Sequence, residues 1–470
     1  MVTTNNYDLI ILGGGAAAFA AATEADRRKL RTVIINAGLP MGGTCVNVGC
    51  VPSKHLLALG KGLYHPSHPD FAGIEAVSPA FDFDLAMTGK DSLVETLRQQ
   101  NYQEVLDSFS HVEFIEGRGR LLDARRVKVE KQELTGDRIL IATGSRTKVP
   151  PFNGLAETGY LTHIEALELK HLPTSLIIFG AGFLALEFAQ IFNRMGTKVT
   201  LVARAPRILR VQEPEISEAL RSCLEGEGIE ILTETAVRQV SQGSGCKQVS
   251  ITTANGKRVL EAEDLLVATG VRGNVDDMGL VEAGLEIVDN DRVQVDEYLQ
   301  TRVAHIYAAG DITGCKRLET VAAKQGKLAV ENAFFNARKS INLNSVPYAV
   351  FTDPEVASVG LTEADYMALH GTCSCRTIPM KMVPRAVTVN DTRGLLKMVA
   401  HHETGKIVGV HILAPNASEM IHEATLAVKY GLSVDDLIDT VHIFPTYCEA
   451  IKMAAQAFRR DISTMSCCVE

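Results

Sequence analysis

The sequence lacks three features that mark common classes of binding, membrane or secreted protein. It has no block of basic residues, and 47 Lys and Arg against 56 Asp and Glu give a net charge of −9. This balance argues against nucleic acid and anionic membranes as partners. The apolar stretches are interrupted by glycine or charge before they reach the roughly 18 residues of a membrane span. No basic region precedes the first apolar strand, so we predict no signal peptide and a cytoplasmic location.

The chain of 470 residues is too long for one ordinary hydrophobic core, so several domains of roughly 150 residues each are expected. It contains ten cysteines, which in a reducing compartment favour catalysis or metal binding over structural disulfides. Two of them, Cys467 and Cys468, are adjacent near the C-terminus. Packing explains such thiols poorly, because chain ends are seldom buried. Their function is expected to lie in what they bind.

A glycine-rich turn follows the first apolar stretch, in YDLIILGGGAAAFAAATEADRRKLRTVIIN. The order strand, turn, helix, strand predicts a dinucleotide-binding unit. Gly13 permits the tight turn, Gly15 lets a pyrophosphate approach the backbone, and Ala18 allows close helix–strand packing. The second strand ends at Asn36, where an acid usually holds the ribose. The amide of Asn36 can hydrogen-bond there but carries no charge.

The same pattern recurs in SLIIFGAGFLALEFAQIFNRMGTKVTLVAR, with Gly180, Gly182 and Ala185 in the corresponding positions. Two such units in one chain predict two bound dinucleotides. Arg204 and Arg210 follow the last strand of this unit. A guanidinium group can donate two hydrogen bonds to a 2′-phosphate, but it cannot accept a hydrogen bond from a ribose 2′-hydroxyl. NADP(H) is therefore favoured over NAD(H). The alternative is that these arginines are solvated surface charges.

Two cysteines lie between the units, in GGTCVNVGCVPSKHLL. Cys45 and Cys50 have the spacing C-x4-C, which does not fit the usual zinc knuckle, and no second Cys or His pair follows at knuckle spacing. Pro52 suits the first turn of a helix that begins at about Val51. Cys50 would then lie at a helix N-terminus, where the dipole lowers the pKa of a thiol. The alternative is a pair of inert core cysteines.

These segments together resemble the pyridine nucleotide-disulfide oxidoreductases, the family of glutathione reductase and dihydrolipoamide dehydrogenase. GGTCVNVGCVPSK is similar to the redox-active disulfide segment of that family, and RILIATGS, LLVATG and HIYAAGDITG follow in the family's order. The resemblance implies FAD, a homodimer, and electron flow from NADPH through the flavin to a Cys45–Cys50 disulfide. Lys54 and Glu187 would flank the isoalloxazine, unless they form an ordinary surface ion pair. The other implied cofactor contacts are Gly43, Thr44, Thr143, Gly144, Gly270 and Asp311.

The order of these segments predicts an α/β fold with two doubly wound, Rossmann-like dinucleotide-binding domains and a C-terminal α+β dimerisation domain. We expect residues 1–150 and 271–340 to form the FAD-binding domain and residues 151–270 to form the NADPH-binding domain. Residues 341–470 should form the dimerisation domain and a C-terminal metal-binding tail. Alternating strands separated by turn residues and followed by helices support this last assignment.

One residue that disulfide reductases of this family require is missing. They carry His-Pro-Thr-x-x-Glu, in which the histidine is the general acid and base of thiol–disulfide exchange. Here Pro445, Thr446 and Glu449 match, but Phe444 takes the place of the histidine. Phe cannot move a proton, and a general acid–base group contributes roughly 100- to 10,000-fold to the rate. His442 lies two residues earlier and is expected to point elsewhere.

A soft metal ion held by thiolates suits such a site, because its reduction requires electrons but no protonation of a leaving thiol. The missing histidine, the segments VPRA (383–386) and DTRG (391–394), and the terminal cysteine pair together resemble the mercuric reductases of this family. That resemblance implies that Cys467 and Cys468 capture Hg(II) from a thiolate complex. The ion would pass to Cys45 and Cys50 of the partner subunit, so that the two subunits share active sites, and would be reduced there to Hg(0).

The sequence departs from the mercuric reductases at two positions. They usually have tyrosine at the position of Phe444 and often near Phe183, facing the metal. Both residues are phenylalanine here, so any phenol function is either missing or supplied by Tyr447.

Two other functions remain consistent with the sequence. One is an NADPH-dependent disulfide reductase of the thioredoxin-reductase type, with Cys467 and Cys468 as a shuttle. Such enzymes also end in adjacent redox cysteines, but they keep the His–Glu pair. The other is a flavoprotein that only sequesters a soft metal. Metal-dependent NADPH oxidation separates mercury reduction from both.

Overall fold

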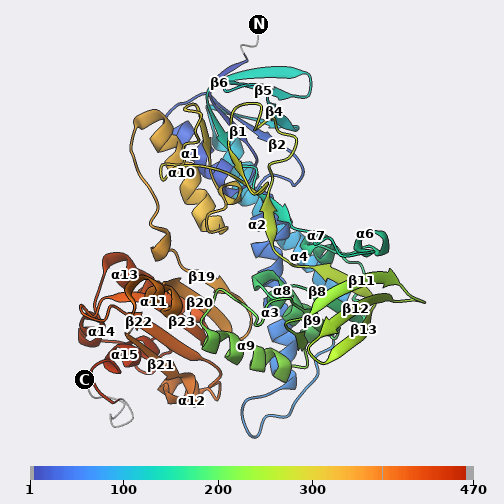
Figure 1. Ribbon diagram of the computed structural model, residues 1–470, viewed down its shortest axis with the longest axis vertical. Coiled ribbons are helices and arrows are strands. Elements are labelled where there is room, and N and C mark those ends of the chain that lie inside the picture. The colour runs from blue at the N-terminus through green and yellow to red at the C-terminus, as the bar shows by residue number, and fades with distance from the viewer. Residues whose placement is uncertain (1–4, 373, 462–470) are drawn as a thin grey trace. The chain divides into compact units, whose positions relative to one another are not determined.

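The computed structural model describes residues 5–461 except Cys373, and the chain forms two compact units (Figure 1). The first unit comprises residues 1–55, 84–148 and 270–341, and the second comprises residues 56–83, 149–269 and 342–470. Each unit gathers three segments, so its contacts join residues that are far apart in the sequence. Among the described helices, none has both the length and the apolar composition that a bilayer crossing requires.

A seven-stranded sheet forms the core of the first unit. Four of its strands pair in parallel in the order β3-β2-β1-β6, and β18 pairs in parallel with β6. The alanine-rich helix α1 and helix α10 lie side by side against this sheet (Figure 1). The sheet consists of β1 (Asn6–Leu12), β2 (Thr32–Asn36), β3 (Val112–Glu116), β4 (Gly119–Leu121), β5 (Arg126–Val129), β6 (Gln132–Ile141) and β18 (Ile306–Ala308).

The helices of the first unit follow the predicted βαβ order. Helix α3 begins at Cys50, one residue before the predicted start, and continues into the second unit's sequence. The helices are α1 (Ala16–Arg27), α2 (Gly43–Val48), α3 (Cys50–Ser67), α4 (Phe83–Arg98), the π-helical turn η1 (Gln99–Gln103), α5 (Glu104–Ser108), the 3-10 turn η2 (Asp311–Thr313) and α10 (Glu319–Phe335). Short ladders are formed by β7 (Ser145–Thr147) with β15 (Val271–Gly273) and by β16 (Ile287–Val288) with β17 (Arg292–Val293).

The second unit contains the second nucleotide-binding pattern as a parallel sheet of order β10-β9-β8-β14, with a separate antiparallel sheet of order β11-β12-β13. The strands are β8 (Ser175–Phe179), β9 (Lys198–Val202), β10 (Glu230–Leu232), β11 (Ala236–Gln242), β12 (Lys247–Thr253), β13 (Gly256–Ala262) and β14 (Asp264–Val267). The helices are α6 (Leu155–Thr158), α7 (His163–Leu167), α8 (Phe183–Arg194) and α9 (Pro214–Gly226).

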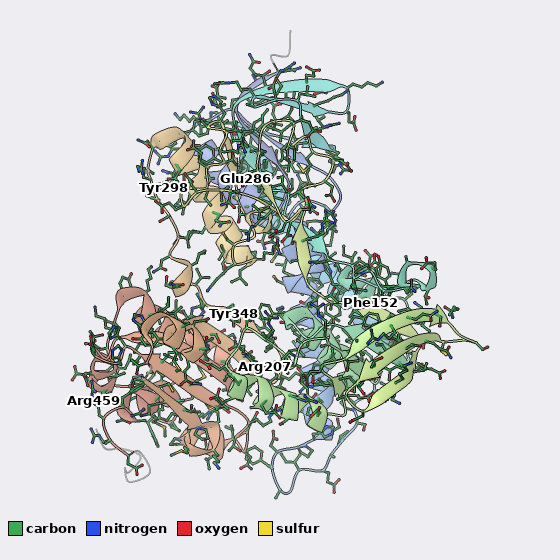
Figure 2. All side chains as sticks on the ribbon, in the orientation of Figure 1. Phe152, Arg207, Glu286, Tyr298, Tyr348 and Arg459 are labelled. Atoms are coloured by element: carbon green, nitrogen blue, oxygen red, sulfur yellow. The ribbon has the colours of Figure 1, made fainter. Side chains whose placement is uncertain are left out.

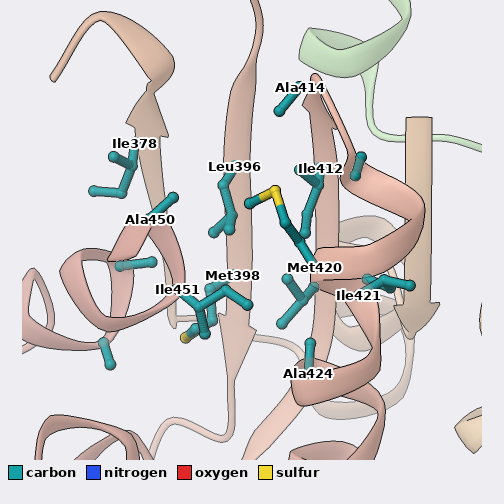
Figure 3. Packing of buried hydrophobic residues seen from close by; sticks show 14 of the residues in the cluster. Ile378, Leu396, Met398, Ile412, Ala414, Met420, Ile421, Ala424, Ala450 and Ile451 are labelled. Carbon is teal, nitrogen blue, oxygen red and sulfur yellow. The ribbon is translucent and has the colours of Figure 1, made fainter. Parts of the chain in front are cut away.

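The C-terminal part of the second unit is a five-stranded antiparallel sheet of order β19-β20-β23-β22-β21. Its apolar face packs on α13 and α15 (Figure 3). The strands are β19 (Tyr348–Val350), β20 (Glu355–Gly360), β21 (Ser374–Pro379), β22 (Leu395–Ala400) and β23 (Ile407–Ala414). The helices are η3 (Leu343–Ser345), α11 (Glu363–His370), η4 (Met380–Met382), α12 (Pro384–Thr388), α13 (Ala417–Tyr430), α14 (Val434–Asp439) and α15 (Glu449–Gln456).

Strand alternation gives the C-terminal sheet a second, polar face. Leu396 and Met398 point into the core of Figure 3, so Lys397 between them points to the opposite face. Register pairs Lys397 with His411, and His411 with Ser358. All three polar residues are nevertheless buried, so the second unit covers both faces of this sheet.

One face of α8 forms hydrogen bonds with the turn between β19 and β20. Glu187, Gln190 and Arg194 are spaced three and four residues apart and therefore share that face. The Glu187 carboxylate accepts the N–H of Phe351 at 3.0 Å, and Gln190 bonds both the N–H (2.8 Å) and the carbonyl (3.0 Å) of Asp353. Arg194 Nη1 donates to the Asp353 carboxylate at 3.0 Å. The helix that begins at the second glycine turn is thus fixed to the C-terminal sheet.

Asp353 forms ion pairs with Arg194, Lys61 and Arg393, and we call this group the Asp353 charge centre. Its burial would raise its pKa, but the positive charges of Arg194, Lys61 and Arg393 outweigh burial and lower the pKa to about 2. The Arg194 side chain is only 2% exposed and also binds Glu227 at 2.6 Å. A buried carboxylate in this position depends on its cations.

We predict that Arg194→Met lowers the free energy of unfolding of the second unit by about 3–5 kcal/mol, because Asp353 would remain buried without its main partner. The pKa of Asp353 is depressed, so the stability it contributes is present above its unfolded pKa and is lost as pH falls toward about 2. The difference between wild type and variant, measured by urea titration, should therefore be full at pH 7 and shrink below about pH 4.

The matched control is Arg459→Met, which breaks the exposed Arg459–Asp435 pair. Its effect should stay within about 1 kcal/mol at every pH. Equal effects of the two variants would contradict the role given to the Asp353 contact.

Candidate functional site

The first glycine turn has the close backbone approaches that a bound pyrophosphate needs. Gly13 has φ +118°, and a Cβ there would lie 2.2 Å from the carbonyl oxygen of Ala142, so only glycine fits. Gly15 precedes α1, and a Cβ on Gly43 would come within 2.8 Å of the Gly15 Cα. Ala18 is fully buried at the helix–strand contact. The turn and the start of α2 thus approach each other through glycines, which fits the close backbone approach that the pyrophosphate of FAD requires.

Asn36 ends β2 beside this turn. Its Nδ2 donates to the Leu39 carbonyl at 2.9 Å, and a Cβ on Gly14 would lie 2.5 Å from its Oδ1. The amide oxygen therefore faces the glycine turn, where it can accept from a ribose hydroxyl. Thr44 is exposed in the first turn of α2.

The remaining predicted FAD contacts of the first unit gather at the carboxyl ends of β6 and β18. Thr143 and Gly144 follow β6 and are tied to Asn274, whose N–H donates to the Gly144 carbonyl at 3.0 Å. Asp311 opens η2 just after β18, and its Oδ2 accepts from Ser145 Oγ at 2.6 Å. Because β1, β2, β6 and β18 are parallel, these residues and both glycine-turn contacts lie at one edge of the sheet, and they fit FAD.

Cys45 and Cys50 lie on consecutive helices and differ in environment. Cys45 is half-buried within α2, whereas Cys50 is exposed as the first residue of α3. The hydrogen bond with Cys50 and burial raise the pKa of the Cys45 thiol. The proton of a reduced pair is therefore expected on Cys45, and the helix N-terminus at Cys50 favours its thiolate.

Tyr102 is a neighbour of these thiols that the sequence did not suggest. Burial and the negative charges of Cys45, Glu319 and Cys50 raise its pKa to about 12. Its ring packs edge-on against Phe19 at 4.9 Å between centroids. Tyr102 lies in the π-helical turn η1, far from the cysteines in sequence and in no motif. No pattern in the sequence marks such a turn, although π turns are frequent at functional sites.

The second glycine turn repeats the geometry of the first. Gly180 has φ +130°, and a Cβ there would lie 2.2 Å from the carbonyl oxygen of Ala268. Gly182 precedes α8, and Ala185 in its first turn is fully buried. Gly270 has φ +109° after the neighbouring strand β14. The turn fits a second pyrophosphate, that of a nicotinamide dinucleotide.

The arginine loop (residues 203–213) follows β9 beside this turn. Arg207 is turned inward and donates to the carbonyls of Arg210 (3.2 Å) and Gln212 (3.5 Å). Arg204 and Arg210 are exposed, and within the described chain their side chains make no hydrogen bond or ion pair. These two guanidinium groups are thus available to a phosphate, while Arg207 braces the loop.

The position that a catalytic histidine would take is filled by Phe444, which has no group to transfer a proton. Phe444 is 50% exposed, and the carboxylate of Glu449 accepts the backbone N–H of Thr446 at 3.1 Å. The His442 ring binds Glu423 at 2.8 Å, and this hydrogen bond raises the pKa of His442. Both ring nitrogens of His442 are therefore engaged, Nδ1 with the Thr440 carbonyl and Nε2 with Glu423.

Tyr447 and the DTRG segment lie close together. Tyr447 is half-buried, and burial followed by the charge of Asp391 raises its pKa, while Arg385 and Arg393 oppose this. Arg393 binds Asp391 through two bonds of 2.8 and 2.7 Å and reaches Asp353 at 3.4 Å. The DTRG segment therefore supports the Asp353 charge centre. Cys448 packs against the C-terminal core, and burial raises its pKa.

Several predicted site residues stay untested by these contacts. Cys467 and Cys468 lie outside the described residues. Lys54 belongs to the first unit and Glu187 to the second, where the Glu187 carboxylate holds Phe351. Across residues 5–461 without Cys373, no group of three or more His, Cys, Asp or Glu is arranged to hold a metal ion.

Comparison with known proteins identifies the family. Residues 7–328 match the pyridine nucleotide-disulphide oxidoreductase family, and residues 346–455 match its dimerisation domain. The chain belongs to this family. As a pyridine nucleotide-disulphide oxidoreductase it uses FAD and NADPH, and its dimerisation domain supports a homodimer. The predicted α/β fold with two nucleotide-binding patterns and a C-terminal dimerisation domain is confirmed.

Similar proteins within the family cover almost the whole chain. A mercuric reductase of Streptomyces lividans is 40% identical over 98% of both chains, and one of Lysinibacillus sphaericus is 38% identical over 100% of this chain and 85% of its own length. Among solved structures, a Cu(II) complex of the HOCl-induced flavoprotein disulfide reductase RclA of Escherichia coli is 27% identical, with a TM-score of 0.86 over 96% of this chain and 99% of its own.

We predict that Cys50 is alkylated before Cys45 when the reduced, FAD-free protein meets limiting iodoacetamide at pH 7. Cys50 is exposed, and the pKa of Cys45 is raised. The reagent should therefore reach Cys50 more easily, and Cys50 should be the thiol that is deprotonated. Peptide mass spectrometry of a variant with Cys467→Ser and Cys468→Ser gives the order. Cys223 and Cys448, whose pKa values are raised by burial, serve as slow internal controls. Earlier labelling of Cys45 would refute this assignment.

Proposed function

We propose that the protein reduces Hg(II), presented as a thiolate complex, to Hg(0) with the two electrons of one NADPH. The observation that carries this proposal is a redox-type dithiol in a chain with no proton donor at Phe444. A disulfide substrate needs its leaving thiolate protonated, whereas a metal ion needs only electrons. The mercuric reductases that match nearly the full chain support the same reaction.

The chain's own residues bind and orient the two dinucleotides. We infer that residues 1–150 and 271–340 hold FAD through the first glycine turn and Asp311, and that residues 151–270 hold NADPH through the second glycine turn. Arg204 and Arg210 would take the 2′-phosphate, since both are exposed and without side-chain partners in the described chain. FAD, when bound, accepts the hydride of NADPH and passes an electron pair on. Lys54 would stabilise negative charge beside the flavin.

The dithiol of Cys45 and Cys50 is the proposed acceptor of electrons and then of mercury. Thiolates are the ligands that a soft ion prefers, and Cys50 begins α3 with its thiol exposed. Binding Hg(II) to both sulfurs releases the proton that Cys45 holds. The pKa of Tyr102 is about 12, so its phenol stays protonated at neutral pH. It therefore adds no negative charge that would bind Hg(II) more tightly and slow its reduction. We propose Tyr102, in place of Tyr447, as the phenol of the site.

We propose further that each active site is shared between subunits. Large apolar side chains stand exposed between residues 426 and 444, where a partner subunit would cover them. They are Leu426, Tyr430, Leu432, Val441, Ile443 and Phe444. Phe444 belongs to this surface, so the site would form against the partner chain. Cys467 and Cys468 would capture Hg(II) and deliver it to Cys45 and Cys50 across the interface.

The alternative of a disulfide reductase is disfavoured by Phe444, which cannot act as the general acid and base of thiol–disulfide exchange. The alternative of metal sequestration is disfavoured by two glycine turns that both fit dinucleotides, since sequestration alone requires no electron path.

We predict catalytic NADPH oxidation that depends on Hg(II) in the presence of excess small thiol, followed at 340 nm, with volatile mercury as product. Turnover of glutathione disulfide and lipoamide should be roughly 100-fold or more lower, because the general acid is missing. Phe444→His alone should not restore it, since the groups that orient a catalytic imidazole are also needed. Efficient disulfide turnover by the wild type would refute mercury reduction as the function. A single stoichiometric burst would indicate sequestration.

Mixed dimers test the shared site. One subunit carries Cys50→Ala, and the other carries Cys467→Ser with Cys468→Ser. Each homodimer should be inactive under conditions that require the terminal pair. If transfer crosses the interface, the mixed dimer holds one complete site, and mercury-dependent NADPH oxidation should return to about half of the wild-type value per dimer. Absence of activity in a verified heterodimer would show that transfer stays within one chain.

A further inference from the structure

A row of polar side chains crosses the C-terminal sheet on the face opposite its apolar core. Strand register places Tyr348 beside Ser358, Ser358 beside His411, and His411 beside Lys397, across four strands. We name these four residues the polar row. Lys397 and His411 are each only 2% exposed, so the row contacts protein along its length. Any role of the polar row must therefore be carried out through the protein segments that it contacts.

The contact partner is the end of the arginine loop. Gln212 Nε2 donates to the hydroxyl of Tyr348 at 2.8 Å and to Ser358 Oγ at 2.7 Å. The next residue, Glu213, accepts from Lys397 Nζ at 3.0 Å. Gln212 and Glu213 are 2% and 1% exposed, so these bonds are shielded from water. The C-terminal sheet thus fixes the end of a loop whose exposed arginines lie a few residues earlier.

The rest of the loop depends on that anchor. Leu209 has φ +42°, a left-handed conformation that a leucine keeps only when its surroundings impose it. Its N–H donates to the carbonyl of Ala181 in the second glycine turn at 2.9 Å, and its carbonyl accepts from the Gln212 N–H at 2.7 Å. Arg207 closes the loop through its bonds to the carbonyls of Arg210 and Gln212. The position of the Arg210 guanidinium is therefore linked to the position of Gln212.

Tyr348 also contacts the glycine turn directly. Its ring stacks on Phe183, the first residue of α8, with 5.4 Å between centroids and 25° between planes. Burial raises the pKa of Tyr348 to about 12, so the hydroxyl stays protonated. One residue of the C-terminal sheet thus holds both the start of α8 and the arginine loop. Figure 2 labels Tyr348 and Arg207, which come from β19 and from this loop.

We infer that Tyr348 is a positioning residue that sets the preference for a 2′-phosphorylated nicotinamide dinucleotide. Its hydroxyl holds Gln212, and Gln212 holds the arginine loop in the conformation that presents Arg204 and Arg210. Its ring keeps Phe183 in place for either dinucleotide. This inference rests on the proposal that Arg204 and Arg210 bind the 2′-phosphate.

The test is Tyr348→Phe, which keeps the ring stack and removes the hydroxyl. We predict that the Kd for NADP+, measured by calorimetry on the FAD-loaded enzyme, rises about fivefold, the effect of one lost hydrogen bond. The Kd for NAD+ should not change, and kcat with saturating NADPH should stay at the wild-type value while KM rises. Gln212→Met, which removes the bonds to both Tyr348 and Ser358, should raise the Kd for NADP+ at least as much and leave the Kd for NAD+ unchanged.

Two controls keep the outcomes distinct. Tyr366→Phe removes another buried hydroxyl of the same unit, bonded to His402 at 3.2 Å and remote from the loop in its contacts, and should change neither Kd. Arg204→Ala with Arg210→Ala should abolish the preference for NADP+. If this double variant binds NADP+ as wild type does, the proposed phosphate site is wrong. If the double variant loses the preference but Tyr348→Phe binds both dinucleotides as before, or weakens both equally, the role of Tyr348 is refuted.

Discussion

The hold of α8 on the turn between β19 and β20 is the contact on which the second unit depends. Glu187, Gln190 and Arg194 line one face of the helix and satisfy two backbone N–H groups, one carbonyl and one buried carboxylate. Leaving such groups unpaired away from water is costly, so these bonds stabilise the observed arrangement of α8 and the turn. Because α8 starts at the second glycine turn, the same contact fixes where a dinucleotide can bind.

The polar row and the Asp353 charge centre extend this constraint in two directions. Lys397 gathers Glu213, Glu215 and Glu363 around one buried ammonium group, and those carboxylates raise its pKa although burial alone would lower it. Arg393 extends the Asp353 centre to Asp391 in the DTRG segment. The second unit therefore fastens the arginine loop and α8 to the same sheet by charge as well as by packing.

Sequence patterns predicted the parts of the fold that depend on local backbone geometry. Gly13 and Gly180 had to be glycine because a carbonyl lies 2.2 Å from where a Cβ would be, and such turns have a recognisable spacing. Cys50 was placed correctly because helix starts have local signals. Tyr102 was not predicted, because it lies near the thiols only through a π-helical turn, which no sequence pattern marks. The sequence analysis named Arg204 and Arg210 as phosphate ligands but did not predict that Arg207 braces the loop, since that role depends on contacts with backbone carbonyls.

The contact of α8 with the turn between β19 and β20 also limits how the two halves of the chain can evolve. The two matched family regions, residues 7–328 and 346–455, look like separable modules in the sequence. Yet Glu187, Gln190 and Gln212 lie in the first region, while Phe351, Asp353 and Tyr348 lie in the second. A recombination event between the two regions would join surfaces that had not evolved together. The two regions are therefore constrained to diverge as a pair, and natural exchange of one without the other should be rare among functional descendants.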